Sequence, residues 1–123
     1  MARRAEALTS FLPISFVMML MLLIPFTSGL VQEQKTWCVA KPSSSQATLW
    51  ENLNYACSQV DCGIIREGCA CFKPDNLMSH ASIAMNLYYQ ANGKNSWNCF
   101  FKNSALIATT DPSFGDCTYA HND

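Results

Sequence analysis

The sequence predicts a small, disulfide-stapled α+β domain with two main helices followed by a short antiparallel sheet. The 123 residues include 7 cysteines, two segments have apolar residues at helical spacing, and short strand-like segments follow near the end of the chain. A net charge of −1 excludes a strongly basic nucleic-acid binder. A hydrophobic content of 50% excludes an intrinsically disordered chain.

Residues 1–29 have the pattern of a secretory signal peptide. A basic start precedes a stretch of 16 residues without charge, residues 11–26, and small residues follow it. Pro13 and Pro25 interrupt this stretch, which is shorter than the roughly 20 residues that span a bilayer, so a retained membrane anchor is the weaker alternative. We therefore expect cleavage before Leu30, secretion to the extracellular space or cell wall, and no membrane anchor in the product.

After the signal peptide we expect a polar lead-in at 30–36, one domain at 37–119 and a C-terminal tail at 120–123. So small a domain has little hydrophobic core, and disulfides usually compensate for that. The odd number of cysteines implies a leftover thiol, and spacing alone leaves the pairing open. Cys69-Ala70-Cys71 lacks the second ligand pair of a structural zinc site, so we expect no metal and no cofactor. The cysteines are Cys38, Cys57, Cys62, Cys69, Cys71, Cys99 and Cys117.

The first part of the domain contains one predicted strand and one predicted helix. Residues 37–40 are apolar enough for a short strand. A helix is expected over 46–57, capped by Ser44 or Ser45, and a single helical turn over 61–65. The apolar stripe of the helix consists of Leu49, Leu53, Ala56 and Cys57.

A second and stronger helix is predicted from Asn76 to Ala91. Asp75 is its expected cap, and Asn92-Gly93 is a typical helix end. The inner stripe of this helix consists of Leu77, Ala81, Ala84, Met85 and Tyr88. Short strands are then predicted at 97–101, 105–109 and 117–119, with a turn at 111–115.

The cysteines and the residues around them resemble a known pattern over almost the whole predicted mature chain, from Trp37 to Tyr119. Its motifs are Trp37-Cys38-Val39, Asn54-Tyr55-Ala56-Cys57, Asp61-Cys62-Gly63, Ala70-Cys71-Phe72-Lys73-Pro74, His80-Ala81-Ser82-Ile83-Ala84-Met85-Asn86, Tyr88-Tyr89-Gln90, Trp97-Asn98-Cys99, Thr110-Asp111-Pro112-Ser113 and Cys117. This order is similar to the plant X8 domain, also called carbohydrate-binding module family 43. The family includes the C-terminal domains of long plant endo-β-1,3-glucanases, plasmodesmal callose-binding proteins and a small olive pollen allergen.

The resemblance implies a non-catalytic domain that binds β-1,3-glucan, a callose-like polysaccharide of the plant cell wall. Cys69 stands where the family usually has a small residue, so we expect a free thiol in a monomer, with a Cys69-linked dimer as the alternative. Ile83 replaces a common aromatic residue and Phe100 a frequent Asp, and both departures concern the sugar contacts more than the fold. The resemblance implies the disulfides Cys38–Cys99, Cys57–Cys62 and Cys71–Cys117.

The acidic residues do not favour catalysis. Glycoside hydrolysis typically needs two carboxylates about 5 Å apart, or about 6.5–9.5 Å for inversion. The acidic residues of this chain are scattered along the sequence, and Asp75 and Asp111 are interpreted as a helix cap and a turn residue. A nucleophile pair of Cys69 and His80 is the weaker alternative, because His80 lies in a helix motif and is expected to be structural. We therefore expect a protein that is not an enzyme.

The candidate binding residues lie at the end of the second helix and in the loop after it. An uncharged glucan needs exposed aromatic rings for its apolar sugar faces and short polar side chains for its hydroxyls. Adjacent helical residues point about 100° apart, and Tyr88 fits the inner stripe. Tyr89 is therefore predicted to face the sugar, whereas Trp37 and Tyr55 are interpreted as packing residues. The candidate site comprises Tyr89, Trp97, Tyr88, Gln90, Asn92, Lys94 and Asn95.

Two other classes of protein remain as alternatives to a carbohydrate-binding module. One is a disulfide-rich secreted signalling or defence protein that binds a protein partner. The other is a lipid-binding protein of the lipid-transfer type. This second class is less favoured, because it should have eight cysteines with an adjacent Cys-Cys pair, which this chain lacks.

Overall fold

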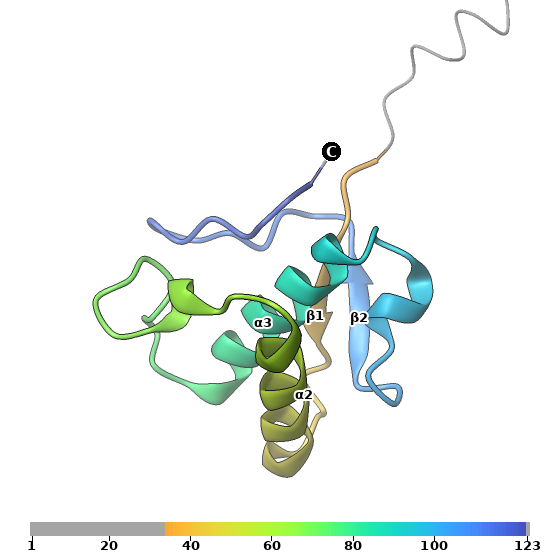
Figure 1. Ribbon diagram of the computed structural model, residues 1–123, viewed down its shortest axis with the longest axis horizontal. Coiled ribbons are helices and arrows are strands. Elements are labelled where there is room, and N and C mark those ends of the chain that lie inside the picture. Colours follow the sequence, from red (N-terminus) through yellow and green to blue (C-terminus); the bar gives the residue numbers. More distant parts are fainter. Residues whose placement is uncertain (1–33, 123) are drawn as a thin grey trace, which may run out of the picture. The chain divides into compact units, whose positions relative to one another are not determined.

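The computed structural model describes residues 34–122, which form an α+β domain as predicted (Figure 1). The predicted signal peptide lies outside the described residues. The short sheet is antiparallel as predicted, and its two strands flank the helices in the sequence, because the predicted strand at 37–40 forms one half of it. Strand β1 (Trp37–Ala40) pairs antiparallel with β2 (Ala105–Ala108), with Trp37 opposite Ala108 and Ala40 opposite Ala105.

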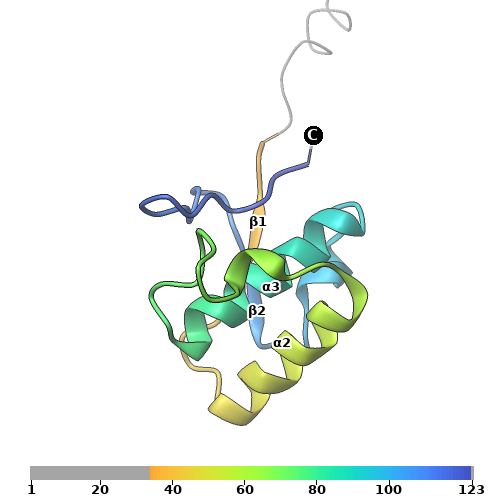
Figure 2. The same ribbon diagram turned by 60° about the vertical axis from the view of Figure 1, so that its left-hand side comes forward.

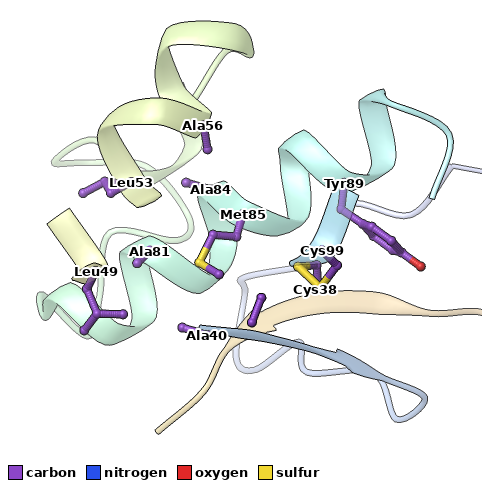
Figure 3. Close-up of a cluster of buried hydrophobic side chains, with 11 residues drawn as sticks. Cys38, Ala40, Leu49, Leu53, Ala56, Ala81, Ala84, Met85, Tyr89 and Cys99 are labelled. Carbon is purple, nitrogen blue, oxygen red and sulfur yellow. A yellow bond between two sulfur atoms is a disulfide. The ribbon is translucent and has the colours of Figure 1, made fainter. Parts of the chain in front are cut away.

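Helix α2 (Gln46–Gln59) confirms the first predicted helix and extends two residues beyond its predicted end. Ser45 is its cap, and its hydroxyl accepts a hydrogen bond from the Thr48 backbone N–H at 3.1 Å. Leu49, Leu53 and Ala56 of α2 are buried in one core cluster with Ala81 and Ala84 of α3 (Figure 3). Three of the four predicted stripe residues are therefore core residues. The fourth, Cys57, is partly buried and forms a disulfide with Cys62.

Helix α3 (Leu77–Ala91) confirms the second predicted helix, but its cap is Asn76 and not Asp75. The Asn76 side chain accepts a hydrogen bond from the Ser79 backbone N–H at 2.8 Å, three residues further on, as a capping side chain does. Because the first helical residue is Leu77, Asp75 lies one position too early to reach this donor.

Helix α3 occupies the middle of the domain, packed between α2 and the sheet (Figures 1 and 2). A polar stripe on α3 hydrogen-bonds the free edge of β1. The backbone N–H groups of Cys38 and Ala40 donate to the side-chain oxygens of Asn86 at 3.1 Å and Ser82 at 3.0 Å. Gln90, one turn further along, donates to the carbonyl of the residue before β1 at 2.9 Å. These buried side chains satisfy the strand edge as a third strand would.

Two of the three late strand predictions are wrong. Residues 96–99 form the short 3₁₀ helix η2 (Ser96–Cys99), and near 117–119 only an isolated bridge between Phe114 and Cys117 occurs. The physical reason is that β1 already has β2 on one edge and α3 on the other. Neither of these late segments finds a free strand edge, whereas residues 105–108 pair with β1.

The three disulfides pair as the resemblance implied, and the exposed thiol of Cys69 stays free among the described cysteines. One bridge joins β1 to η2, one joins the end of α2 to the start of η1 (Gly63–Ile65), and one joins the segment before α3 to the C-terminal segment. The pairs are Cys38–Cys99, Cys57–Cys62 and Cys71–Cys117.

Candidate functional site

An open groove lies where the outer side of α2, the end of α3, η2 and the loop before β2 meet. Its volume of about 410 Å³ is within the rough range of 300–1,000 Å³ for ligand pockets. Two predicted site residues, Tyr88 and Trp97, line it. The full lining consists of Glu51, Asn52, Tyr55, Tyr88, Trp97, Asn98, Phe101 and Lys102.

The wall of the groove is aromatic and centred on Tyr88. The rings of Tyr55 and Phe101 meet the Tyr88 ring edge-on, with centroid distances of 5.4 Å and 5.7 Å. The hydroxyl oxygens of Tyr55 and Tyr88 are 3.4 Å apart. Trp97 stands at the mouth with 71% of its side chain exposed. Such a wall presents apolar faces with polar hydroxyls at their edges.

The hydroxyl of Tyr88 stays protonated over the ordinary pH range. Its hydrogen bond with Tyr55 raises the pKa of Tyr88 above 10.0, and partial burial adds to this rise, while a hydrogen bond from Asn98 opposes it. A neutral phenol both donates and accepts hydrogen bonds, as a ligand rich in hydroxyl groups requires.

The polar rim of the groove has little net charge. Glu51 on α2 and Lys102 form an exposed ion pair at 3.1 Å, which contributes little to stability. Asn52 is buried below them, and its side-chain amide donates to the Ser104 hydroxyl at 2.8 Å. Glu51 supplies the single carboxylate among the lining residues, whereas hydrolysis of a glycosidic bond typically uses two.

The loop before β2 brings two side chains to the groove through an unusual backbone. Phe101, Lys102 and Asn103 have φ values of 48°, 53° and 65°, a left-handed conformation that non-glycine residues rarely adopt. This turn directs Phe101 against Tyr88 and Lys102 against Glu51. Backbone strain of this kind persists only where surrounding contacts hold it.

Tyr89 does not face the groove, and its predicted outward orientation is wrong. Its side chain is 2% exposed, and its hydroxyl is hydrogen-bonded to the Thr36 hydroxyl at 2.8 Å. It lies in the core beside the Cys38–Cys99 disulfide (Figure 3). The prediction failed because α3 is covered on two sides. Tyr89 lies on the face of α3 that packs toward β1, whereas Tyr88 lies at the boundary with α2 and reaches the groove.

The other predicted residues lie near the end of α3 but outside the lining of the groove. Gln90 is buried and links α3 to the segment before β1 and to the C-terminal residues. The Asn92 side chain donates to the Tyr88 carbonyl at 2.8 Å, and that of Asn95 donates to the Asn92 carbonyl at 3.1 Å. Lys94 is hydrogen-bonded to the Asn122 carbonyl.

Sequence reasoning missed the residues that α2 and the loop before β2 contribute. Glu51 and Tyr55 are four residues apart, so they share one face of α2, away from the Leu49 stripe. This spacing could have marked Tyr55 as outward-facing, and it is about half exposed. For Phe101 and Lys102 we find no such signal, because their positions depend on the left-handed turn.

The described residues contain no group of three or more His, Cys, Asp or Glu side chains that could hold a metal ion. Among the helices of the same region, none is long and apolar enough to cross a membrane.

The fold and groove define a small disulfide-bonded domain with an open aromatic surface. Residues 36–106 match the X8 domain model, and the chain belongs to the X8 domain family. It is 43% identical over 90 residues to the major pollen allergen Ole e 10 of Olea europaea, and the match covers 72% of this chain and 73% of the allergen.

Enzymes share the same region. The chain is 51% identical over 85 residues to a glucan endo-1,3-beta-D-glucosidase of Olea europaea, and 49% identical over 83 residues to a glucan endo-1,3-beta-glucosidase of Triticum aestivum. Each match covers 68% of this chain but spans only 18% of the enzyme's length.

Proposed function

We propose that this protein is a secreted, non-catalytic module that binds β-1,3-glucan in the groove between α2, α3 and η2. The observation that carries the proposal is the aromatic wall formed by Tyr55, Tyr88 and Phe101, with Trp97 at its mouth. The names of two glucosidase relatives support the choice of polysaccharide, because both enzymes act on a 1,3-linked glucan and share this domain.

The groove suits an uncharged polymer. Sugar rings present apolar C–H faces that pack against aromatic side chains, and their hydroxyls pair with phenol, amide and charged groups at the rim. The groove is open to solvent, so a long chain can enter along its length, whereas an enclosed cavity would admit only a chain end. The balanced pair of Glu51 and Lys102 presents no net charge to the ligand.

The proposal excludes hydrolysis by this domain. The groove lining supplies one carboxylate, which is engaged with Lys102, whereas the common mechanism uses an acid and a nucleophile or base. The region shared with the glucosidases is less than a fifth of their length. We infer that the shared domain contributes binding in those enzymes as well.

Secretion belongs to the same proposal. Three disulfides in one small domain are typical of oxidising compartments. The predicted signal peptide at residues 1–29 would direct the chain there, and the cell wall is where its proposed ligand lies. We propose a monomer with a free Cys69 thiol.

The test is retention of the oxidised, secreted protein on insoluble β-1,3-glucan, with cellulose and starch as controls. Selective retention on β-1,3-glucan would support the proposal. A folded protein that is retained on none of the three would contradict it, and a protein partner would then become the leading alternative. Uptake of a fluorescent lipid would instead favour the lipid-binding class.

A further inference from the structure

Two exposed aromatic side chains, three positions apart in the sequence, lie at η2 and directly after it. Trp97 is 71% exposed and Phe100 is 57% exposed, which makes them the most exposed large apolar side chains in the described part of the chain. Phe100 does not line the groove, whereas Trp97 does. Single exposed apolar residues are common on protein surfaces, but an exposed apolar pair that continues a groove is typical of a binding site.

Trp97 lies in η2, and Phe100 is the residue that directly follows this helix with a backbone still in the right-handed helical region. A 3₁₀ helix has three residues per turn, so side chains three positions apart point the same way. Trp97 and Phe100 are therefore one turn apart, and both are exposed while Asn98 and Cys99 between them are buried. The bridge from Cys99 to Cys38 of β1 holds this orientation.

Phe100 and Phe101 are adjacent in the sequence, but their side chains point in different directions. Phe101 has a φ of 48° and turns inward to contact the Tyr88 ring. Phe100 keeps a negative φ of −107° and remains outside. The backbone of this turn is held by the Ser104 N–H, which donates to the Phe100 carbonyl at 3.2 Å.

We propose that Phe100, together with Trp97, binds a sugar unit of the same glucan chain beyond the end of the groove. The inference rests on the proposed function and extends its site from the groove to the outer face of η2. We choose the glucan chain as the ligand for two reasons. Trp97 belongs both to the groove and to the outer face of η2, so one chain can contact both. Two uncharged aromatic rings also suit the apolar faces of an uncharged polymer. The site would then favour longer chains over short oligosaccharides.

The test compares the affinities of the full secreted protein for a β-1,3-linked glucose trisaccharide and hexasaccharide by titration calorimetry. Wild type should bind the hexasaccharide more tightly. Phe100→Ala should lose roughly three- to tenfold in hexasaccharide affinity, with little change for the trisaccharide. Phe100→Tyr, which keeps the ring, should retain the wild-type length dependence.

Trp50→Ala is the matched control, because Trp50 is an aromatic residue of similar exposure, 54%, outside the groove lining. It should leave both affinities unchanged. Suppose that wild type binds both sugars. If Phe100→Ala then binds each sugar as tightly as wild type does, or loses affinity for both by the same factor, this inference is overturned while the proposed function stands. If folded wild type binds neither sugar, the proposed function is overturned as well.

Discussion

Trp97 has the side chain on which the proposed binding function depends most directly. It lines the groove yet makes little use of its ring in packing, since 71% of it is exposed. We expect Trp97→Ala to weaken binding to β-1,3-glucan at least about tenfold, as the loss of a central aromatic contact does. Its unfolding free energy should change by no more than about 0.5 kcal/mol. Affinity gels and urea unfolding measure the two effects.

Trp50→Ala serves as the control for this variant, because it removes an exposed tryptophan of α2 that does not line the groove. Equal losses of binding in the two variants would show that the groove is not the site.

Tyr89 belongs to the stability of the domain and not to ligand contact. We expect Tyr89→Ala to lower the unfolding free energy by about 3–5 kcal/mol, because it empties a buried site in the core. Tyr89→Phe should cost only about 1 kcal/mol, since it removes the hydrogen bond to Thr36 and keeps the ring. Urea unfolding measures both, and a Tyr89→Ala protein as stable as wild type would contradict the burial.

Tyr119 makes stability depend on alkaline pH. Burial raises the pKa of Tyr119 from 10.0 to about 12, so the folded state favours the neutral phenol. This contribution to stability is fully present below pH 10 and is lost as the pH rises from about 10 toward 12. Between pH 8 and 11, wild type should therefore lose stability relative to Tyr119→Phe.

Urea unfolding of both proteins across this range measures the effect, in a Cys69→Ser background that prevents thiol exchange at high pH. The other tyrosines are present in both proteins, so their titration cancels in the difference. A difference in unfolding free energy that stays constant with pH would contradict the assignment to Tyr119.

At the scale of elements, α3 organises both the core and the site. One of its faces packs on α2, a polar stripe closes the edge of β1, and Tyr88 at the boundary reaches the groove. A helix that contacts its neighbours on two sides has a buried arc wider than a single apolar stripe. Its buried polar residues are therefore as important to its position as its apolar residues are.

The start of α3 offers a test between two neighbouring residues. Asn76 caps the helix through Ser79 N–H, whereas the Asp75 side chain is exposed and lies before the cap. Asn76→Ala should lower the unfolding free energy by about 1 kcal/mol. Asp75→Ala should change it by less than about 0.5 kcal/mol. Thermal or urea unfolding measures both changes. A larger loss of stability for Asp75→Ala than for Asn76→Ala would show that Asp75 is the cap.

At the scale of the whole molecule, disulfides supply stability that the small core does not. Under the loop-entropy model, a bridge that closes a longer loop stabilises more. Cys38–Cys99 has a sequence separation of 61 and Cys57–Cys62 a separation of 5, so we expect their removal to cost about 4 and about 2 kcal/mol. Paired Cys→Ser substitutions and urea unfolding measure these costs.

Cys69→Ser is the matched control for these disulfide variants, because Cys69 is exposed and unpaired. It should leave stability unchanged within about 0.5 kcal/mol. Equal losses for the long and the short bridge would contradict the loop-entropy account.

The local and covalent features of this protein could be predicted from the amino-acid sequence. Ser45 and the Leu49 stripe predicted α2, the apolar spacing from Leu77 predicted α3, and the family resemblance implied the disulfide pairs. These features depend on spacing along the chain, on capping chemistry or on an order of motifs that resembles a known family, all of which are present before folding.

The tertiary fold was needed to tell which of two adjacent tyrosines lines the groove, which late segment joins the sheet, and where Phe101 points. Tyr89 is buried because β1 covers one side of α3. Residues 105–108 pair with the edge of β1 that α3 does not cover, and Phe101 enters the groove through a left-handed turn. Each outcome depends on a neighbour that is distant in sequence or on a rare backbone conformation. Local propensity carries no information about either.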